Sequence, residues 1–257
     1  MSEKLWYLKN CQLFQLLTPE DLRQVEASSR VRSFPKKAPI YLPADTSHDV
    51  FLLASGRIKL CHITPDGKQS ILAFIDPGEL FGELAMLDDG QREEYAEALE
   101  KSTVVLIPRA TIERLMETHA HLTLGVTKMI GLRRRRIERR LKNLLFLSNR
   151  DRLVHLILDL VEQYGRNTEE GVALTIKLSH QELANVIGST RETVTVLLGE
   201  MQLEGLLKVG RRKMILRKLE SLAASVHRSV PELPRETSPA PLRRIVPKPS
   251  VSAEDAT

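Results

Sequence analysis

Short apolar runs separated by turn residues occupy the chain from about residue 38 to residue 107. The runs are Val50–Ala54, Ile58–Ile63, Ile71–Ile75 and Thr103–Ile107, and the turns include Ser55-Gly56, Pro65-Asp66-Gly67 and Asp76-Pro77-Gly78. Runs of this length bounded by glycine, proline and aspartate are typical of β-strands. Many such strands at this spacing predict an antiparallel barrel or a double-sheet roll.

Helical patterns lie on both sides of this strand-rich stretch. Within residues 1–35, Thr18-Pro19-Glu20-Asp21 has the form of a helix start, with a threonine cap, proline in the first turn and acidic residues at the positive end of the helix. Residues 109–147 follow Pro108 and contain no proline themselves, so we expect helices there.

An apolar stripe runs along the second helical stretch. Ile130, Ile137 and Leu144 recur every seven residues, and Leu141 lies on a neighbouring position. The stripe fits a seam against a second copy of the chain, and it fits equally a face packed on the chain's own barrel. The basic run Arg133–Arg136 on the same helix is interpreted as a solvated face, because charge runs usually are.

The remaining residues divide into a folded segment and a tail. Ser148-Asn149-Arg150-Asp151 predicts a capped helix that continues to about Tyr164, followed by a Gly165–Gly171 loop. The last thirty residues contain six prolines among serine, threonine and alanine, which is typical of a disordered tail. The predicted segments of the chain are 1–108, 109–147, 148–226 and 227–257.

Residues 179–204 predict two helices joined by a tight turn. Ser179 and Glu182 are spaced as a capping box, and Ser189 and Glu192 repeat that spacing ten residues later. Gly188 is expected to end the first helix, since glycine tolerates the left-handed conformation of a sharp turn. The apolar stripe of the second helix consists of Val194, Leu197, Leu198 and Met201.

The opposite face of this second helix carries short and polar side chains, as a helix-turn-helix needs where it meets DNA. Its members are Glu192, Thr195, Val196 and Gly199, with Arg191 at the margin. An ordinary antiparallel helix pair inside a globular domain would share this spacing. The following residues favour DNA, because a predicted hairpin over 206–216 has the basic tip Gly210-Arg211-Arg212-Lys213, which can neutralise phosphates.

Composition restricts the class of protein without identifying it. The 257 residues are 42% hydrophobic and 28% charged, which suits two modest globular domains, and the net charge of +5 is compatible with nucleic acid. Cys11 and Cys61 are too few for a disulfide framework or a cysteine metal cluster. No signal peptide or membrane span is evident, so we expect a cytoplasmic protein without a membrane partner. No nucleophile–base set or phosphate loop indicates an enzyme, and no cofactor or metal is expected.

Three motifs in this order resemble the cyclic-AMP receptor/fumarate–nitrate regulator (CRP/FNR) family of bacterial transcription regulators, over about residues 13–222. They are Gly78-Glu79-Leu80-Phe81-Gly82-Glu83-Leu84, Asn143-Leu144-Leu145-Phe146-Leu147 and Gly188-Ser189-Thr190-Arg191-Glu192-Thr193-Val194. The resemblance implies an α+β fold with an N-terminal antiparallel β-roll of the cyclic-nucleotide-binding type, a long dimerisation helix and a C-terminal winged helix-turn-helix. It also implies a homodimer on a near-palindromic site in double-stranded DNA, with RNA polymerase as a further candidate partner. The dimer-seam interpretation of Ile130, Ile137, Leu141 and Leu144 is then favoured.

By the same resemblance, Arg191 and Glu192 are the expected base readers. The chemistry agrees, because arginine can donate two hydrogen bonds to guanine and a carboxylate can accept one from cytosine. Val196 stands where better-known members carry a third base-reading arginine, and Ser179 to Gln181 are expected to hold phosphates. The predicted DNA contacts are Ser179, His180, Gln181, Ser189, Thr190, Arg191, Glu192, Thr195, Val196, Arg211, Arg212 and Lys213.

The effector pocket of nucleotide-binding members is expected to be vestigial here. Its positions are Gly82, Glu83, Leu84, Glu93, Glu94, Ile137 and Glu138. Glu93 and Glu94 stand where those members carry a phosphate-binding Arg-Ser pair, and two carboxylates repel a phosphate, so dependence on cyclic AMP is not expected. Arg92 is one place out of register and is expected on the opposite side of its strand. We expect Glu93 or Glu94 to pair with an arginine of the long helix instead.

Cysteine and histidine residues do not indicate a metal or haem site. Cys61 and His62 are adjacent, so they should point to opposite faces of a strand as a buried thiol and a surface histidine. His119 and His121 are interpreted as solvated. A function of another class stays open, namely a small-molecule or redox sensor whose output is a protein partner; Arg191-Glu192 together with the basic hairpin favours DNA.

Overall fold

The computed structural model describes residues 2–45, 49–86, 92–211 and 213–234. The chain begins with helix α1 (Glu3–Asn10), the short 3-10 helix η1 (Gln12–Phe14) and α2 (Pro19–Ser28). The predicted helix start at Thr18 is confirmed, since the Thr18 side chain accepts from the Asp21 amide in a full capping box. The predicted disordered tail, 227–257, is described only as far as residue 234. Within that part Arg228 pairs with Asp159 at 2.8 Å and Leu233 packs against the core, so the prediction is wrong for these residues; residues 235–257 lie outside the described ones.

Two four-stranded antiparallel sheets follow and confirm the predicted roll. One has the order β1 (Arg30–Phe34), β8 (Ser102–Pro108), β3 (Asp49–Ser55) and β6 (Leu80–Phe81). The other has the order β2 (Pro39–Tyr41), β7 (Tyr95–Ala98), β4 (Ile58–Ile63) and β5 (Gln69–Ile75). Apolar side chains of both sheets, among them Phe51, Leu60, Phe81 and Val104, form the core between them.

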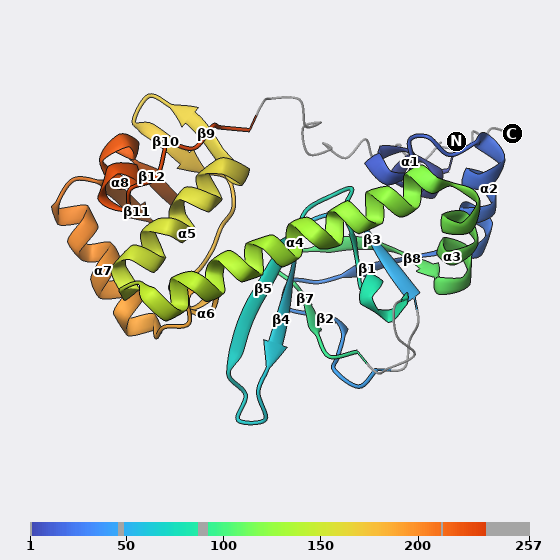
Figure 1. Cartoon of the computed structure of the whole chain (residues 1–257), viewed down its shortest axis with the longest axis horizontal. Helices are drawn as coiled ribbons and strands as arrows, with labels where there is room; N and C mark the ends of the chain where they lie inside the picture. The colour runs from blue at the N-terminus through green and yellow to red at the C-terminus, as the bar shows by residue number, and fades with distance from the viewer. Residues whose placement is uncertain (1, 46–48, 87–91, 212, 235–257) are drawn as a thin grey trace, which may run out of the picture.

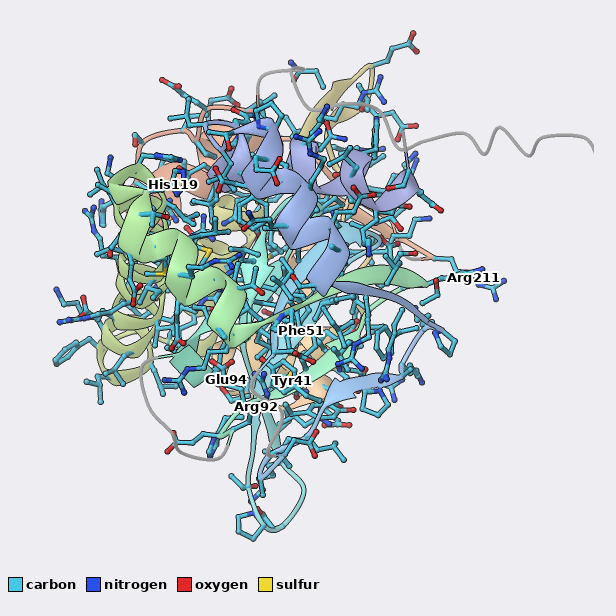
Figure 2. The ribbon with its side chains drawn as sticks, turned by 90° about the vertical axis from the view of Figure 1, so that its right-hand side faces the viewer. Tyr41, Phe51, Arg92, Glu94, His119 and Arg211 are labelled. Atoms are coloured by element: carbon cyan, nitrogen blue, oxygen red, sulfur yellow. The ribbon has the colours of Figure 1, made fainter. Side chains whose placement is uncertain are left out.

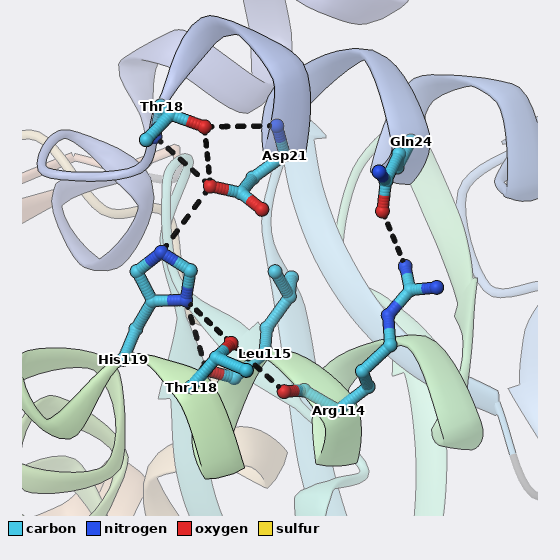
Figure 3. A network of polar contacts seen from close by, with 7 residues as sticks. All are labelled: Thr18, Asp21, Gln24, Arg114, Leu115, Thr118 and His119. Atoms are coloured by element: carbon cyan, nitrogen blue, oxygen red, sulfur yellow. Dashed lines mark hydrogen bonds and ion pairs between the residues drawn. The ribbon is translucent and has the colours of Figure 1, made fainter.

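Two helices connect the roll to the C-terminal part: α3 (Arg109–Thr118) and the long α4 (Ala120–Phe146). Figure 1 shows α4 crossing the molecule from the N-terminal helices to the C-terminal part. Leu122 and Val126 pack one end of α4 against the N-terminal helices. A polar network reinforces this junction (Figure 3), because His119 Nε2 lies 3.2 Å from Asp21 and its Nδ1 lies 2.8 Å from Thr118 Oγ1.

The interpretation of His119 as solvated is therefore wrong. Its side chain is only 19% exposed, and its two ring nitrogens face α2 and the end of α3. The hydrogen bond from Thr18, with a smaller contribution from His119, lowers the pKa of Asp21. His119 thus connects helices that are far apart in the sequence.

The C-terminal part contains α5 (Asn149–Tyr164), β9 (Gly165–Thr168), β10 (Gly171–Leu174), α6 (His180–Ile187), α7 (Arg191–Leu203), β11 (Leu207–Gly210), β12 (Lys213–Leu216) and α8 (Leu219–Ser225). The predicted cap of α5 is confirmed, as Ser148 accepts from the Asp151 amide. The predicted loop at 165–171 is wrong, because β9 and β10 form a hairpin within the sheet β11-β12-β10-β9. On its other side β10 pairs with β12, more than forty residues further along the chain.

The roll and the C-terminal part share a continuous apolar core. Cys61, Ile71 and Phe74 of the roll belong to the same cluster as the buried faces of α5 and α6. At its edge the Tyr164 hydroxyl donates to Asp76 Oδ2 at 2.6 Å, and Arg57 Nε donates to the other oxygen at 2.6 Å. Burial and the Asp76 charge raise the pKa of Tyr164, which favours its protonated, donating form. The two parts are thus docked by apolar packing and a polar clamp.

Candidate nucleic-acid interface and effector pocket

The turn between α6 and α7 has the predicted geometry. Ser179 and Glu182 form the capping box, with the Ser179 amide donating to Glu182 Oε2 at 2.7 Å and the Glu182 amide donating to Ser179 Oγ at 3.2 Å. Gly188 ends α6 at φ 64° and ψ 48°, the left-handed conformation that glycine adopts without steric cost. The chain can therefore reverse within three residues before α7 begins.

The second predicted capping box, Ser189 with Glu192, is wrong. Thr190 is the residue that caps α7, because its side chain accepts from the Thr193 amide at 3.2 Å. The Ser189 amide instead donates back to the Ala184 carbonyl, which closes the end of α6. Helix α7 therefore starts one position later than predicted.

Helix α7 presents the expected faces. Val194, Leu198 and Met201 are buried against α5 and α6, whereas Arg191, Glu192, Thr195 and Val196 are exposed. The Thr195 hydroxyl donates to the Arg191 carbonyl and lies 2.8 Å from His180 Nδ1, which links the exposed face of α7 to the start of α6. Arginine and carboxylate groups thus stand at the solvent-facing amino end of a well-supported helix.

The predicted basic hairpin is formed by β11 and β12. Arg211 is exposed and extends away from the body of the molecule in Figure 2, and Lys213 is also exposed; Arg212 lies outside the described residues. The Val209 amide donates to Gln202 Oε1 at 2.9 Å, so the hairpin is fixed to the end of α7. Basic side chains and the exposed face of α7 therefore belong to one rigid unit.

Inside the roll, the predicted orientation of Arg92 is wrong. Arg92 is 8% exposed, and its guanidinium lies 4.3 Å from the Tyr41 ring centre and 5.0 Å from that of Phe51. Its nitrogens donate to the carbonyls of Gly82 and Asp49. Gly82 has a left-handed φ of 70°, and a Cβ there would lie 2.8 Å from the Phe51 ring, so glycine is needed at this position. Arg92 thus fills space between aromatic rings that line the roll.

Glu93 and Glu94 do not form the predicted pair of inward carboxylates. Glu93 is exposed, whereas Glu94 turns inward and accepts from the Tyr41 hydroxyl at 3.1 Å; Figure 2 shows Glu94, Tyr41 and Arg92 together. Burial, and after it the neighbouring Glu83 charge, raises the pKa of Glu94. The extended chain before β7 alternates its side chains, and the structure sets that alternation one residue away from the prediction.

An ion pair joins the roll to α4 at Glu83. Arg133 Nη1 lies 2.9 and 3.0 Å from the two Glu83 oxygens, with the side chains 12% and 6% exposed, and Arg133 also donates to the Leu80 carbonyl. The expected pairing of Glu93 or Glu94 with a helix arginine is therefore wrong, since Glu83 is the partner. Arg133 is also not solvated, and neither is Arg140, which donates to the Leu72 carbonyl at 2.8 Å.

The other predicted pocket positions do not converge. Leu84 and Ile137 are exposed, and Glu138 pairs with Arg134 at 2.7 Å on the outer side of α4. Helix periodicity explains this, because the side of α4 that meets the roll carries Arg133, Arg136 and Arg140. Of the predicted set, Gly82, Glu83 and Glu94 lie around the Arg92–Arg133 region.

Three of the four predicted seam residues lie on a different side of α4 from the one that meets the roll. Ile137, Leu141 and Leu144 are 40%, 53% and 47% exposed, and Ile130 is half-buried. An apolar stripe left uncovered on a helix of 27 residues is unusual for a surface in water. The alternative that this stripe packs on the chain's own roll holds for Ile130, which packs partly against the core of the roll and the N-terminal helices, and is wrong for Ile137 and Leu141, which are largely uncovered.

Metal and membrane features add little to the site. Cys61 is buried, with its pKa raised to about 12 by burial, and His62 is exposed, as predicted. Within the described ranges, no group of three or more histidine, cysteine or acidic side chains is placed to hold a metal ion. Among the described helices, none combines the length and apolarity needed to span a bilayer.

Comparisons with known proteins agree with this geometry. The cyclic nucleotide-binding domain family matches residues 31–119, and the Crp-like helix-turn-helix domain family matches residues 151–225. The chain is 29% identical over 203 residues to the cyclic AMP receptor protein of Thermus thermophilus, covering 79% of this chain and 91% of that protein. It is 27% identical to the global nitrogen regulator of Nostoc sp. PCC 7120, covering 75% of this chain and 87% of the relative.

Solved structures show the same fold. A transcriptional regulator of the CRP/FNR family from Thermus thermophilus superposes with a TM-score of 0.61 at 27% identity, covering 77% of this chain and 98% of that chain. A CooA mutant from Carboxydothermus hydrogenoformans superposes with a TM-score of 0.70 at 24% identity, covering 79% of this chain and 90% of that chain. The second likeness concerns the fold alone.

Proposed function

Because the chain belongs to the CRP/FNR family of transcription regulators and carries its helix-turn-helix DNA-binding domain, we propose that it reads a near-palindromic promoter site as a homodimer. The observation that carries this proposal is the exposed amino end of α7, where Arg191 and Glu192 face solvent on a helix anchored by Val194 and Leu198. Arg191 reads a guanine and Glu192 a cytosine. Val196, which is 59% exposed, touches a thymine methyl or leaves its base pair unread.

The phosphate contacts come from both sides of α7. One stretch of the DNA backbone is held by side chains at the start of α6 and around the turn, namely Ser179, His180, Gln181, Ser189, Thr190 and Thr195. Another stretch is held by the hairpin residues Arg211 to Lys213. We assign residues 1–108 to the effector-like roll, 109–147 to the connecting and dimerising helices, 148–226 to the DNA-binding domain and 227–257 to a tail. RNA polymerase is a further proposed partner, and the cytoplasm the proposed location, since the protein works where the DNA is.

Replacing Arg191 with alanine is expected to weaken binding to the selected site by roughly 1–3 kcal/mol per half-site and to weaken binding to random DNA far less. The reason is that a base contact contributes only where its base is present. The site itself comes from selection on a randomised DNA library, and affinities are measured by fluorescence anisotropy. Arg211→Ala is the matched control, since loss of a phosphate contact should weaken both DNAs alike and reduce the salt slope by about one unit or less. Equal losses for Arg191→Ala on both DNAs would make Arg191 a phosphate contact.

We further propose that DNA binding does not depend on a cyclic nucleotide. Support comes from the polar groups inside the roll, which already have protein partners: Glu83 is bonded to Arg133, and Arg92 is bonded to two backbone carbonyls and stacked on Tyr41. The family resemblance implies that a carboxylate at the position of Glu83 binds a ribose hydroxyl of the nucleotide. A ligand shifts an equilibrium only by binding one state more tightly, and here the internal ion pair already joins the roll to α4.

Titration with cyclic AMP or cyclic GMP is accordingly expected to leave DNA affinity unchanged. Binding of nucleotide would have to displace the Glu83–Arg133 contacts, and those groups are largely desolvated. Calorimetry with each nucleotide, alongside DNA binding with and without it, measures this directly. Micromolar nucleotide binding that tightens DNA affinity contradicts the proposal.

A further inference from the structure

A cavity of 120 Å³ opens in the DNA-binding domain between the β11–β12 hairpin and the start of α6. Helix α5 and strand β10 form its floor. Most of its wall is apolar, and the buried members are Leu160, Leu174, Ile176 and Leu183. Apolar cavities of about 150 Å³ hold a small aromatic molecule, so the size and wall of this cavity suit one ring or a branched aliphatic group.

The exposed rim of the cavity is polar and includes a lysine side chain. Ser179 and Lys213 line it and are exposed. Among the residues that the structure describes, the Lys213 ammonium has no hydrogen-bond or ion-pair partner. The nearby acids are engaged elsewhere, because Glu170 pairs with Lys208 at 2.9 Å and Glu182 is bonded to Ser179.

We propose that this cavity between the hairpin and the helix-turn-helix binds a small monocarboxylate with an aromatic or branched aliphatic body. The body replaces water against Leu174, Ile176 and Leu183, which is favourable in proportion to the apolar area covered. The carboxylate lies at the rim beside Lys213, where a charge-assisted hydrogen bond fixes its direction. The Lys213 ammonium matches one negative charge. The leucine and isoleucine side chains of the wall offer no partner for a second, and His180, which also lines the cavity, is bonded through Nδ1 to Thr195.

Occupancy acts on DNA binding through the hairpin, and this step rests on the proposed function. Lys213 begins β12 and is one of the proposed phosphate contacts, so a carboxylate bound there removes one positive charge from the DNA-facing surface. Arg191 and Glu192 on α7 do not line the cavity. The ligand is therefore expected to weaken binding to selected and random DNA by the same factor.

The test uses the full chain in the absence of DNA. Benzoate is the probe, and its binding is measured by ligand-observed NMR. Benzoate is expected to bind with a Kd of about 1 mM or tighter, and benzyl alcohol and acetate about tenfold more weakly, because each lacks one of the two recognised parts. Lys213→Gln should weaken benzoate binding to the level of benzyl alcohol. Lys177→Gln is the matched control: Lys177 is exposed and lies in the chain between the lining residues Ile176 and Leu178, and since it does not itself line the cavity its replacement should leave the Kd unchanged.

Absence of benzoate binding overturns the proposal, and so does equal binding of benzoate and benzyl alcohol or equal loss in the two lysine variants. A cavity-filling variant, Leu183→Phe, gives an independent check: if its circular dichroism spectrum is native, it should lose benzoate and benzyl alcohol alike. Retained benzoate binding in that folded variant places the ligand elsewhere. A protein that binds benzoate but no DNA would refute the proposed function and leave the cavity site standing.

Discussion

Replacing Ile137 with glutamate is expected to convert the protein to monomers and to abolish tight binding to a two-fold symmetric site. Ile137 lies between Ile130, Leu141 and Leu144 on the exposed stripe of α4, so in a homodimer two carboxylates would be buried close together in an apolar seam. Loss of the second DNA-binding domain removes the gain from two linked contacts, commonly a factor of about 10² to 10⁴ in affinity. Light scattering measures the mass, and gel shift on the selected site measures the affinity.

Leu132→Glu is the matched control for that experiment. Leu132 is an exposed leucine of the same helix, 54% exposed, but it lies about 180° around the helix from Leu141. A carboxylate there stays in water, so this variant should remain dimeric and bind DNA normally. A dimeric Ile137→Glu protein, or monomers formed by both variants, would move the seam to another surface.

Replacing Arg133 with alanine is expected to lower the free energy of unfolding by about 3–5 kcal/mol, because it leaves the Glu83 carboxylate buried without its ionic partner. Glu83 is 6% exposed, and the Arg133 guanidinium contacts both of its oxygens. The loss should appear as a lower denaturation midpoint in urea. DNA affinity should fall as well, since this ion pair connects the roll to the helix that positions the DNA-binding domain.

Arg134→Ala separates this effect from a general loss of charge on α4. Arg134 also pairs with a glutamate, Glu138, but the two side chains are 78% and 50% exposed. Exposed pairs of this kind contribute about 0–1 kcal/mol. Similar midpoints for the two variants would show that the Glu83–Arg133 pair is no more important than a surface pair. A double variant, Arg133→Met with Glu83→Leu, should recover much of the lost stability, because neither partner then leaves a buried charge without the other.

The amino-acid sequence determined the features that depend on residues close together in the chain. The capping boxes at Thr18 and Ser179, the left-handed turn at Gly188 and the buried stripe of α7 follow from spacings of three or four residues, and the structure contains all of them. The strands β3, β4, β5 and β8 were evident for the same reason, since apolar runs between turn residues are local signals. The family resemblance then supplied the order of the domains.

Only the tertiary structure decided which polar groups meet inside the protein. A shift of one residue before β7 reverses which side chains face inward, so Arg92 rather than Glu93 enters the roll. Glu83 and Arg133 are fifty residues apart, and their contact depends on how α4 lies across the sheets. Strand β10 likewise pairs on its other side with β12, more than forty residues further along the chain. Local sequence specifies helices, strands and turns. The partner of each buried charge is selected by long-range packing, because a buried charge can pair only with a group that the completed fold brings within hydrogen-bond distance.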